Sequence, residues 1–305
     1  MTVTRLPVTR RVQGLPRLIA TDLDGTLLHD DKSVSARTVA ALAAAERAGV
    51  EVFFVTGRPA RWMGVVSEHV HGHGLAICAN GAAVVDLHAG RSLVKVRELP
   101  VPTAREVVAA IRRAAPGATF ALERTTGMTY EPQYTPYFHG DDGPVATAPI
   151  DKLLSSDGPA AGQQTGGDAG RGGSGQGGDP VLKLLVRHAE LSPDGFLELA
   201  RSVAGDLAEI TRSSPSTLLE ISGRGVSKAS TLAQCCAERG IGPEDVIAFG
   251  DMPNDLEMLD WAGRSYAMSN AHPAVLAATS HRTVGNNEDG VAAVIERLLA
   301  TDPPH

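Results

Sequence analysis

Short apolar runs and helical patterns alternate along the first 86 residues. Continuous apolar stretches predict buried strands over residues 18–20, 50–55 and 75–79. After the first of these, Ser35 is placed to cap a helix that ends at Gly49. Pro59, which follows the second, is placed to open another helix. Strands and helices in this order are typical of a Rossmann-like, doubly wound parallel sheet, so the fold class is predicted to be α/β.

The pattern changes from about residue 87. Strand-like runs at 93–97, 119–122, 181–186 and 218–221 are mixed with helical runs at 102–115 and 193–204. We interpret this part as a separate α+β unit inserted between two halves of the sheet domain. The sheet pattern then resumes at 246–251, continues with short strands near 265–268 and 281–284, and ends with a helix over 290–300.

These patterns predict a division of the chain into three parts. They are a flexible N-terminal tail over 1–14, a core sheet domain made of 15–86 and 215–305, and an inserted unit over 87–214. Within the insert, residues 155–180 contain ten glycines in 26 positions, together with polar residues. Such a stretch buries little apolar surface, so we expect a disordered surface loop. An expanded hairpin loop is favoured over a lid.

Composition and charge narrow the class of protein. A chain of 305 residues is long enough for about two domains with filled cores. Its net charge of −7 argues against a nucleic-acid partner, because phosphate binding requires a basic surface. No segment approaches the roughly 20 apolar residues of a membrane span, and no signal peptide is recognised.

The three cysteines, Cys78, Cys235 and Cys236, fit no disulfide or zinc spacing. Reduced, packed thiols suit a cytoplasmic protein, and a cytoplasmic location without a membrane partner is therefore expected. The oligomeric state stays open between monomer and homodimer. Three nearby histidines, His69, His71 and His73, have no evident partner ligands, and we expect them to lie in an exposed loop.

Two carboxylates, Asp22 and Asp24, come directly after the first apolar run. Side chains two positions apart on a strand point the same way, and open α/β sheets bind ligands beyond the carboxyl ends of their strands. The two acids therefore predict a cation site, with an acidic turn as the alternative. A second acidic strand end supplies Asp251, Asn254 and Asp255, for which a capped helix start is the alternative.

Three further positions fit phosphate chemistry. Thr56 and Gly57 lie where a strand becomes a helix, so backbone N–H groups and a hydroxyl can cradle a phosphate there. Lys228 begins a helix near the end of the insert, and beside carboxylates and a phosphate it would balance charge. Taken singly, these positions are also explained by a tight turn and a surface lysine. If the two acidic strand ends are neighbours in one sheet, their oxygens suit Mg²⁺.

The chain resembles the haloacid dehalogenase (HAD) superfamily, and within it the Cof-type phosphatases with an inserted α/β cap (type 2B). Four motifs occur in order: Asp-x-Asp-Gly-Thr-Leu at 22–27, the strand-end threonine segment at 56–58, the lysine at 228, and Gly-Asp-x-x-Asn-Asp at 250–255. The spacing leaves about 130 residues for the cap. The resemblance covers essentially the whole chain from residue 15, although the glycine-rich expansion of the cap departs from the usual pattern.

The resemblance implies a Mg²⁺-dependent phosphatase that hydrolyses a small phosphorylated metabolite, such as a sugar phosphate, through an aspartyl-phosphate. Asp22 would be the nucleophile and Asp24 the acid–base group. The metal would be held by Asp22, Asp24 through its backbone carbonyl, and Asp251, with Asp255 completing the shell.

Phosphate and substrate contacts are implied as well. Thr56, Gly57, Lys228 and Asn254 would bind the phosphoryl group, and Arg58 and Asn80 would lie near the cap interface as substrate contacts. In the cap itself, candidate contacts are Glu123, Arg124, Tyr130 and His139.

Two other functions remain as alternatives. A phosphotransferase or phosphosugar mutase of the same fold would return the phosphoryl group to its substrate, but the short fourth motif favours hydrolysis. A metabolite-binding regulator without turnover is disfavoured because all the chemical positions are present. A dehydrogenase is excluded by the lack of a Gly-x-Gly-x-x-Gly after the first strand.

Overall fold

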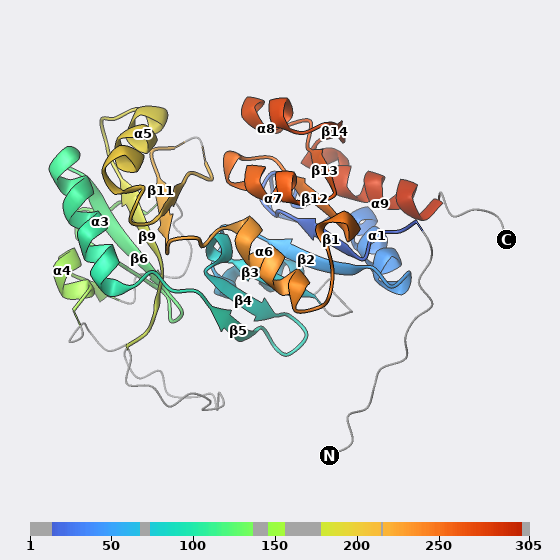
Figure 1. Ribbon diagram of the computed structural model, residues 1–305, viewed down its shortest axis with the longest axis horizontal. Coiled ribbons are helices and arrows are strands. Elements are labelled where there is room, and N and C mark those ends of the chain that lie inside the picture. Colours follow the sequence, from blue (N-terminus) through green and yellow to red (C-terminus); the bar gives the residue numbers. More distant parts are fainter. Residues whose placement is uncertain (1–13, 68–73, 137–145, 156–177, 215, 301–305) are drawn as a thin grey trace, which may run out of the picture.

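The computed structural model describes residues 14–67, 74–136, 146–155, 178–214 and 216–300. They form two units that lie side by side, each built on its own sheet (Figure 1). The expected N-terminal tail (except Gly14), the three histidines at 69–73 and most of the glycine-rich stretch (156–177) lie outside the described residues.

The larger unit is an eight-stranded sheet in the order β14-β13-β12-β1-β2-β3-β4-β5. The strands from β14 to β3 run parallel, whereas β4 and β5 are antiparallel to their neighbours. The bounds of the strands are β1 (Leu18–Thr21), β2 (Glu51–Val55), β3 (Leu75–Cys78), β4 (Ala83–Asp86), β5 (Ser92–Val96), β12 (Val246–Gly250), β13 (Arg264–Ala267) and β14 (His281–Arg282). The central strand β1 is fully buried and pairs with β12 on one side and β2 on the other.

Six α-helices and five short 3₁₀ turns accompany the described part of this sheet. The helices are α1 (Ala36–Arg47), α2 (Gly64–Ser67), α6 (Lys228–Ala237), α7 (Leu256–Trp261), α8 (Pro273–Ala278) and α9 (Gly290–Ala300). The turns are η1 (Ala60–Trp62), η2 (Ala79–Gly81), η3 (Pro243–Asp245), η4 (Pro253–Asp255) and η5 (Asn286–Glu288). Ser35 caps α1 as expected, because its hydroxyl accepts from the Thr38 N–H at 3.0 Å.

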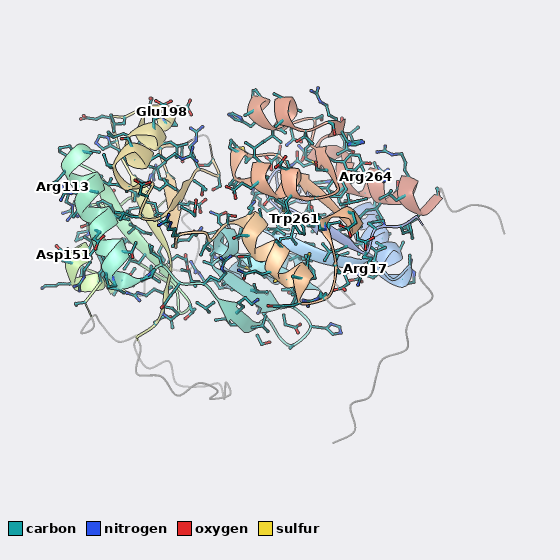
Figure 2. All side chains as sticks on the ribbon, viewed as in Figure 1. Arg17, Arg113, Asp151, Glu198, Trp261 and Arg264 are labelled. Atoms are coloured by element: carbon teal, nitrogen blue, oxygen red, sulfur yellow. The ribbon has the colours of Figure 1, made fainter. Side chains whose placement is uncertain are left out.

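The smaller unit, which we call the cap, is a six-stranded sheet in the order β10-β11-β9-β6-β7-β8. Its strands are β6 (Thr119–Arg124), β7 (Met128–Tyr130), β8 (Ala146–Thr147), β9 (Val181–Arg187), β10 (Glu209–Thr211) and β11 (Leu219–Ser222), and its helices are α3 (Val101–Ala114), α4 (Ile150–Leu153) and α5 (Pro193–Ala204). Helices α3 and α5 cover the face of the sheet that is turned away from the core (Figure 1). Charged side chains such as Arg113 and Glu198 point outward from these helices (Figure 2).

The two faces of the cap sheet differ in what they contact. Phe120, Leu184 and Ile221 point to the helices and join the buried cluster of the cap. Successive side chains on a strand alternate between faces, so the neighbouring residues Lys183 and Glu220 point to the core. The cap thus turns one face of its sheet, which no helix of the described residues covers, toward the carboxyl end of β1.

The predicted fold class is confirmed, but two of the domain limits are corrected. Strand β5, which we assigned to the insert, pairs with β4 at the edge of the core sheet. Strand β11 pairs with β9 in the cap sheet, which agrees with the strand-like run at 218–221 in the insert but not with the limit at residue 215, which placed this strand in the core. Both errors have one cause: an apolar run of four or five residues predicts a strand, but its pairing partner depends on tertiary contacts.

Cys78, Cys235 and Cys236 are all buried, and none of them is in a disulfide. Burial raises the pKa of the Cys78 thiol and of the Cys236 thiol, the latter to about 12, so both are protonated, inert packing groups. Among the described helices, none has the length and apolar character needed to cross a bilayer.

Candidate active site

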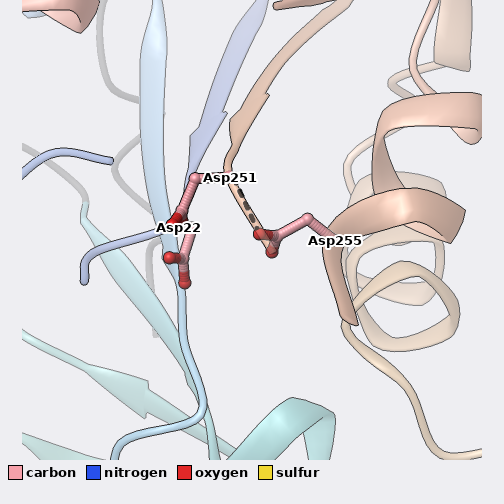
Figure 3. Close-up of side chains that lie close together, drawn as sticks. All are labelled: Asp22, Asp251 and Asp255. Atoms are coloured by element: carbon pink, nitrogen blue, oxygen red, sulfur yellow. Dashed lines mark hydrogen bonds between the residues drawn. The ribbon is translucent and has the colours of Figure 1, made fainter. Parts of the chain in front are cut away.

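The two acidic strand ends lie side by side. Strands β1 and β12 pair in parallel, and the pairing extends past β1, because the Asp22 N–H donates to the Phe249 carbonyl at 3.0 Å. This register brings Asp22 and Asp251 to the same edge of the sheet, where Asp255 joins them from η4 (Figure 3). Each of the three acids offers a carboxylate oxygen within 4.8 Å of the others, and all three are buried.

Lys228 reaches into this cluster from the first turn of α6. Its ammonium donates to Asp22 Oδ1 at 2.6 Å and to Asp255 Oδ1 at 2.7 Å, and the residue is 2% exposed. Burial lowers the pKa of Lys228, but the charges of Asp22 and Asp255 outweigh burial and raise it above its ordinary value. Lys228 is therefore a permanent cation, and the surface lysine considered from sequence is excluded.

The cluster places three carboxyl groups beside one ammonium, so it carries excess negative charge whenever all three acids are ionised. Burial raises the pKa of Asp22 well above its usual value; Asp255 and Asp251 add to the rise, and Lys228 opposes it. Burial, followed by the charge of Asp255, raises the pKa of Asp251 to about 7. Three buried carboxylates facing one ammonium fit a hard divalent cation such as Mg²⁺, which prefers oxygen ligands.

Asp255 differs from the other two acids because its oxygens already have protein partners. Oδ1 accepts from Lys228, and Oδ2 accepts from the backbone N–H groups of Asp251 at 3.1 Å and Met252 at 3.0 Å. The residue is fully buried. Asp255 therefore holds Lys228 and the start of η4 in place, and stands behind Asp22 and Asp251.

Gly25 allows the loop after β1 to approach Asp251. Its φ of +76° is in the left-handed region that favours glycine, and a Cβ there would lie 2.3 Å from Asp251 Oδ2. The hydroxyl of the next residue, Thr26, donates to Asp251 Oδ1 at 2.9 Å. The glycine and threonine of the first motif thus have structural roles that the sequence does not reveal.

The carboxylate of Asp24 points away from the other acids. It accepts from Arg58 Nε at 2.6 Å and Arg58 NH2 at 2.7 Å, and Lys32 Nζ lies 2.9 Å from it. Burial raises the pKa of Asp24, but the hydrogen bonds and charges of Arg58 and Lys32 outweigh burial and lower it below its usual value. The structure therefore joins Asp24 to the predicted substrate contact Arg58, and does not bring its side chain into the acidic cluster.

The loop after β2 contains the predicted phosphate-binding residues. Thr56 is buried, and its hydroxyl accepts from the Arg58 N–H at 3.1 Å. The Thr56 carbonyl accepts from the Asn80 N–H at 3.0 Å. Ala79 and Asn80 both have positive φ values, of 52° and 55°, a strained conformation of the kind found near functional sites. The strained turn therefore holds the Thr56 loop from behind.

Asn80 connects the core to the cap. Its Nδ2 donates to Glu220 Oε2 of the cap at 3.1 Å, and its Oδ1 accepts from Asn254 Nδ2 at 3.3 Å. Asn254 Oδ1 is buried and has no hydrogen-bond partner among the described residues. Because Asn254 lines the cavity described below, this oxygen is available to a bound molecule.

A cavity of about 390 Å³ lies between the core and the cap. This size is within the range of small-molecule binding sites. Its core wall includes eight of the ten predicted core site residues: Asp22, Asp24, Thr56, Gly57, Arg58, Lys228, Asp251 and Asn254. The other two, Asn80 and Asp255, contact this wall from behind.

Of the three cap candidates that lie within the described residues, only Glu123 lines the cavity. Arg124 binds the backbone carbonyls of Asp179 and Leu153, and Tyr130 packs against Tyr134 with ring centroids 5.7 Å apart. Neither is part of the cavity wall. His139 lies outside the described residues.

Three polar residues at the cap–core boundary were not predicted from the sequence, namely Arg61, Lys183 and Glu220. Lys183 pairs with Glu220 inside the cap sheet and donates to the Gly57 carbonyl of the core at 2.7 Å. Arg61 of the core makes a two-pronged contact with Glu123. The available signal was a charged residue inside an apolar strand pattern, as in Val-Leu-Lys-Leu-Leu-Val at 181–186.

The fold and the site define an enzyme-like protein with a Rossmann-like α/β core and an inserted cap over an acidic site. The sequence pattern of the haloacid dehalogenase-like hydrolase family matches residues 19–295 of this chain. The chain therefore belongs to this family, in its Cof-type branch. It is thus an enzyme of the HAD phosphatase type.

Three similar proteins illustrate this membership. A 5-amino-6-(5-phospho-D-ribitylamino)uracil phosphatase of Bacillus subtilis, YitU, is 28% identical over 289 residues, which are 93% of this chain and 98% of the relative. The pyridoxal phosphate phosphatase YbhA of Escherichia coli is 28% identical over 288 residues, covering 92% and 97%. The HAD phosphatase BT1666 of Bacteroides thetaiotaomicron shares the fold, with a TM-score of 0.73 at 21% identity over 97% and 99% of the two chains.

Proposed function

We propose that the protein is a Mg²⁺-dependent phosphatase that hydrolyses a small phosphomonoester through an aspartyl-phosphate on Asp22. The observation that carries the proposal is the buried cluster of Asp22, Asp251, Asp255 and Lys228 at the bottom of the cavity. A cluster with excess negative charge can bind a cation, and the adjoining cavity is large enough for a phosphorylated metabolite whose phosphate contacts that cation.

In the proposed cycle, Asp22 attacks phosphorus and its carboxylate oxygen forms the new P–O bond. The bond to the leaving alcohol breaks, and the alkoxide oxygen takes a proton from Asp24. Asp24 then removes a proton from water, whose oxygen attacks the phosphorus. The bond between phosphorus and the Asp22 oxygen breaks, inorganic phosphate leaves, and the carboxylate of Asp22 is regenerated.

Arg58 links substrate binding to the protonation of Asp24. In the structure, Arg58 holds Asp24 in its ionised form. A phosphate dianion entering the cavity competes for the same guanidinium. Loss of the Arg58 contact raises the pKa of Asp24, which allows the carboxyl group to carry the proton that the leaving alcohol needs.

The phosphoryl oxygens would be bound by the hydroxyl of Thr56, the N–H of Gly57, the ammonium of Lys228 and the second Nδ2–H of Asn254. Asp22, Asp251 and the backbone carbonyl of Asp24 would hold the Mg²⁺ ion, with Asp255 behind them. When bound, the ion neutralises part of the charge on the phosphate and on the two acids.

The substrate is proposed as a small phosphorylated metabolite in the cytoplasm. The relatives named above act on phosphorylated metabolites, one with a pyridine ring and one with a pyrimidine ring joined to a sugar alcohol. The size of the cavity is consistent with molecules of this kind.

The proposal is tested with the variant Asp22→Asn and p-nitrophenyl phosphate as a general substrate. Loss of the nucleophile is expected to reduce kcat/KM by at least about 1000-fold while the circular dichroism spectrum is retained. Removing Mg²⁺ with EDTA is expected to stop turnover of the unaltered protein, and added Mg²⁺ to restore it. An Asp22→Asn protein with a tenth or more of the original activity would exclude Asp22 as the nucleophile.

A further inference from the structure

The cap wall of the cavity contains polar and apolar side chains from the uncovered face of the cap sheet. The polar ones are Glu123, Lys183, Ser213, Ser214 and Glu220, and the apolar or aromatic ones are Met128, Tyr134, Pro136, Leu185 and Leu218. Because the core wall binds the phosphate in the proposed function, the cap wall must face the leaving group. Which of its side chains are available to that group decides the class of substrate.

The charged side chains that the structure describes in the cap wall already have protein partners in the core or in the cap itself. Glu123 is 3% exposed and binds the guanidinium of Arg61. Lys183, also 3% exposed, binds the Gly57 carbonyl and the carboxylate of Glu220. These buried ions are compensated by protein groups, so they dock the cap onto the core before any substrate enters.

Glu220 and the two serines have protein partners as well. The Glu220 carboxylate accepts from Lys183, from Asn80 of the core and from Ser213, and these contacts hold its pKa below the usual range in spite of burial. Ser214 shares a hydrogen bond of 2.7 Å with Ser216. A leaving group that carries many hydroxyls would therefore find few unpaired polar side chains here to recognise it.

Within the described residues, the remaining surface of the cap wall is apolar and partly aromatic. Leu185 and Tyr134 belong to a small buried cluster, against which Met128 and Leu218 pack. Trp62 lines the same cavity from the core wall. Flat aromatic groups favour aromatic and thioether neighbours, and placing a sugar against such a surface would leave its hydroxyls without partners.

We propose that the substrate is a phosphomonoester whose leaving alcohol carries a compact aromatic or heteroaromatic ring, and that Leu185, Leu218, Met128 and Tyr134 are its specificity-determining residues. This inference rests on the proposed phosphatase function and adds the class of leaving group to it. The ring would lie against the apolar part of the cap wall, with its phosphoryl group at the Asp22 end of the cavity.

The test compares esters of primary alcohols, because similar leaving groups make the chemical step comparable. Benzyl phosphate and pyridoxal 5′-phosphate carry a ring, whereas glucose 6-phosphate and ribose 5-phosphate carry hydroxyls. We expect kcat/KM to be at least about 10-fold higher for the two ring-bearing esters, the usual size of discrimination by an apolar pocket. Equal or faster hydrolysis of the sugar phosphates would overturn the inference while leaving the proposed function intact.

Two variants identify the residues responsible. Leu185→Ser and Leu218→Ser are each expected to lower kcat/KM for benzyl phosphate by about 10-fold, while kcat/KM for glucose 6-phosphate changes less than about 3-fold. Leu218 is only partly buried, so its variant tests the inference even if Leu185→Ser does not fold. Val203→Ser, at a position on the outside of α5 that is 37% exposed, is the matched control and should change neither value.

The outcomes distinguish failure of the proposed phosphatase function from failure of the proposed preference for a ring. If p-nitrophenyl phosphate and all four esters resist hydrolysis in the presence of Mg²⁺, the proposed function fails, and the inference fails with it. If both leucine variants lower kcat/KM equally for ring-bearing and sugar esters, the apolar wall has no part in selection, and the inference alone is overturned.

Discussion

The core and the cap both contain buried ion pairs, but the pairs differ in how they are built. In the core, Lys228 pairs with two of the three clustered carboxylates, and the excess of acidic groups suits a cation and a phosphate. In the cap, Lys183 and Glu220 project from the faces of neighbouring strands, and their charges are matched. A cluster whose charges do not balance can bind a cation and a phosphate, whereas a pair whose charges balance is suited to holding the cap against the core.

The comparison is tested most strongly by removing the cation of the core cluster. Lys228→Met leaves three buried carboxylates without their ammonium, and we expect kcat/KM to fall by at least about 1000-fold. In Mg²⁺-free buffer the free energy of unfolding should fall by about 3–5 kcal/mol, as measured by urea denaturation.

Lys95→Met is the matched control for this variant. Lys95 pairs with Glu238, whose side chain is 57% exposed, and exposed pairs contribute less than about 1 kcal/mol. The control should keep its activity. A Lys228→Met protein with wild-type activity would contradict the catalytic role of the core cluster.

The matched pair in the cap is tested with Glu220→Gln. This change keeps the size of the side chain but leaves the charge of Lys183 buried without its counter-ion, so we expect a loss of about 3 kcal/mol in the free energy of unfolding. Because the pair docks the cap and takes no part in bond breaking, kcat/KM should fall less than about 100-fold.

The double variant Lys183→Met/Glu220→Gln sharpens this result. Removing both charges is expected to recover most of the lost stability, which a double-mutant cycle measures as a coupling energy. If Glu220→Gln left stability unchanged and abolished turnover, Glu220 would belong to the chemistry of the site, and the distinction between the two ion pairs would fail.

The smallest expected effect is the pH dependence of stability in the absence of Mg²⁺. The pKa of Asp251 is raised to about 7 in the folded protein, against roughly 4 in an unfolded chain. The folded state therefore binds this proton more tightly, and the resulting stability is lost as the pH rises toward 7. The Tm in EDTA should fall by a few degrees between pH 5 and pH 8.

Mg²⁺ should reverse this loss, and its effect on Tm should be larger at pH 8 than at pH 5, because the ion competes with the proton for Asp251. Thermal unfolding at the two pH values measures both effects. Asp251→Asn is the control, since the amide does not titrate and both effects should shrink. A Tm in EDTA that rises from pH 5 to pH 8 would contradict the raised pKa.

The core of the site was predictable from sequence because its side chains follow strand ends. Parallel pairing of β1 and β12 is enough to bring Asp22 and Asp251 together, and the position of Lys228 at the start of a helix adds the cation. The pairing of Asp24 with Arg58 was not predictable, because it depends on the conformation of a loop and on one long side chain.

The cap was predictable only as a set of elements. Lys183 and Glu220 are in strands that were expected, but which face of each strand points to the core depends on where the two sheets meet. The same limit explains β5, whose strand was predicted and whose partner was not. Local patterns specify elements, whereas their pairing and docking arise from contacts far apart in sequence.

The docking contacts of the cap have a consequence for the speed of the enzyme. Glu123, Lys183 and Glu220 lie on one face of one sheet, and each binds a different core group, namely Arg61, the Gly57 carbonyl and Asn80. Breaking one contact without hydrating the others would leave buried charges unpaired, so separation of cap and core is expected to be a single concerted event. The departure of product would then wait for that event, and the overall turnover rate would report cap opening rather than the breaking of the phosphate ester.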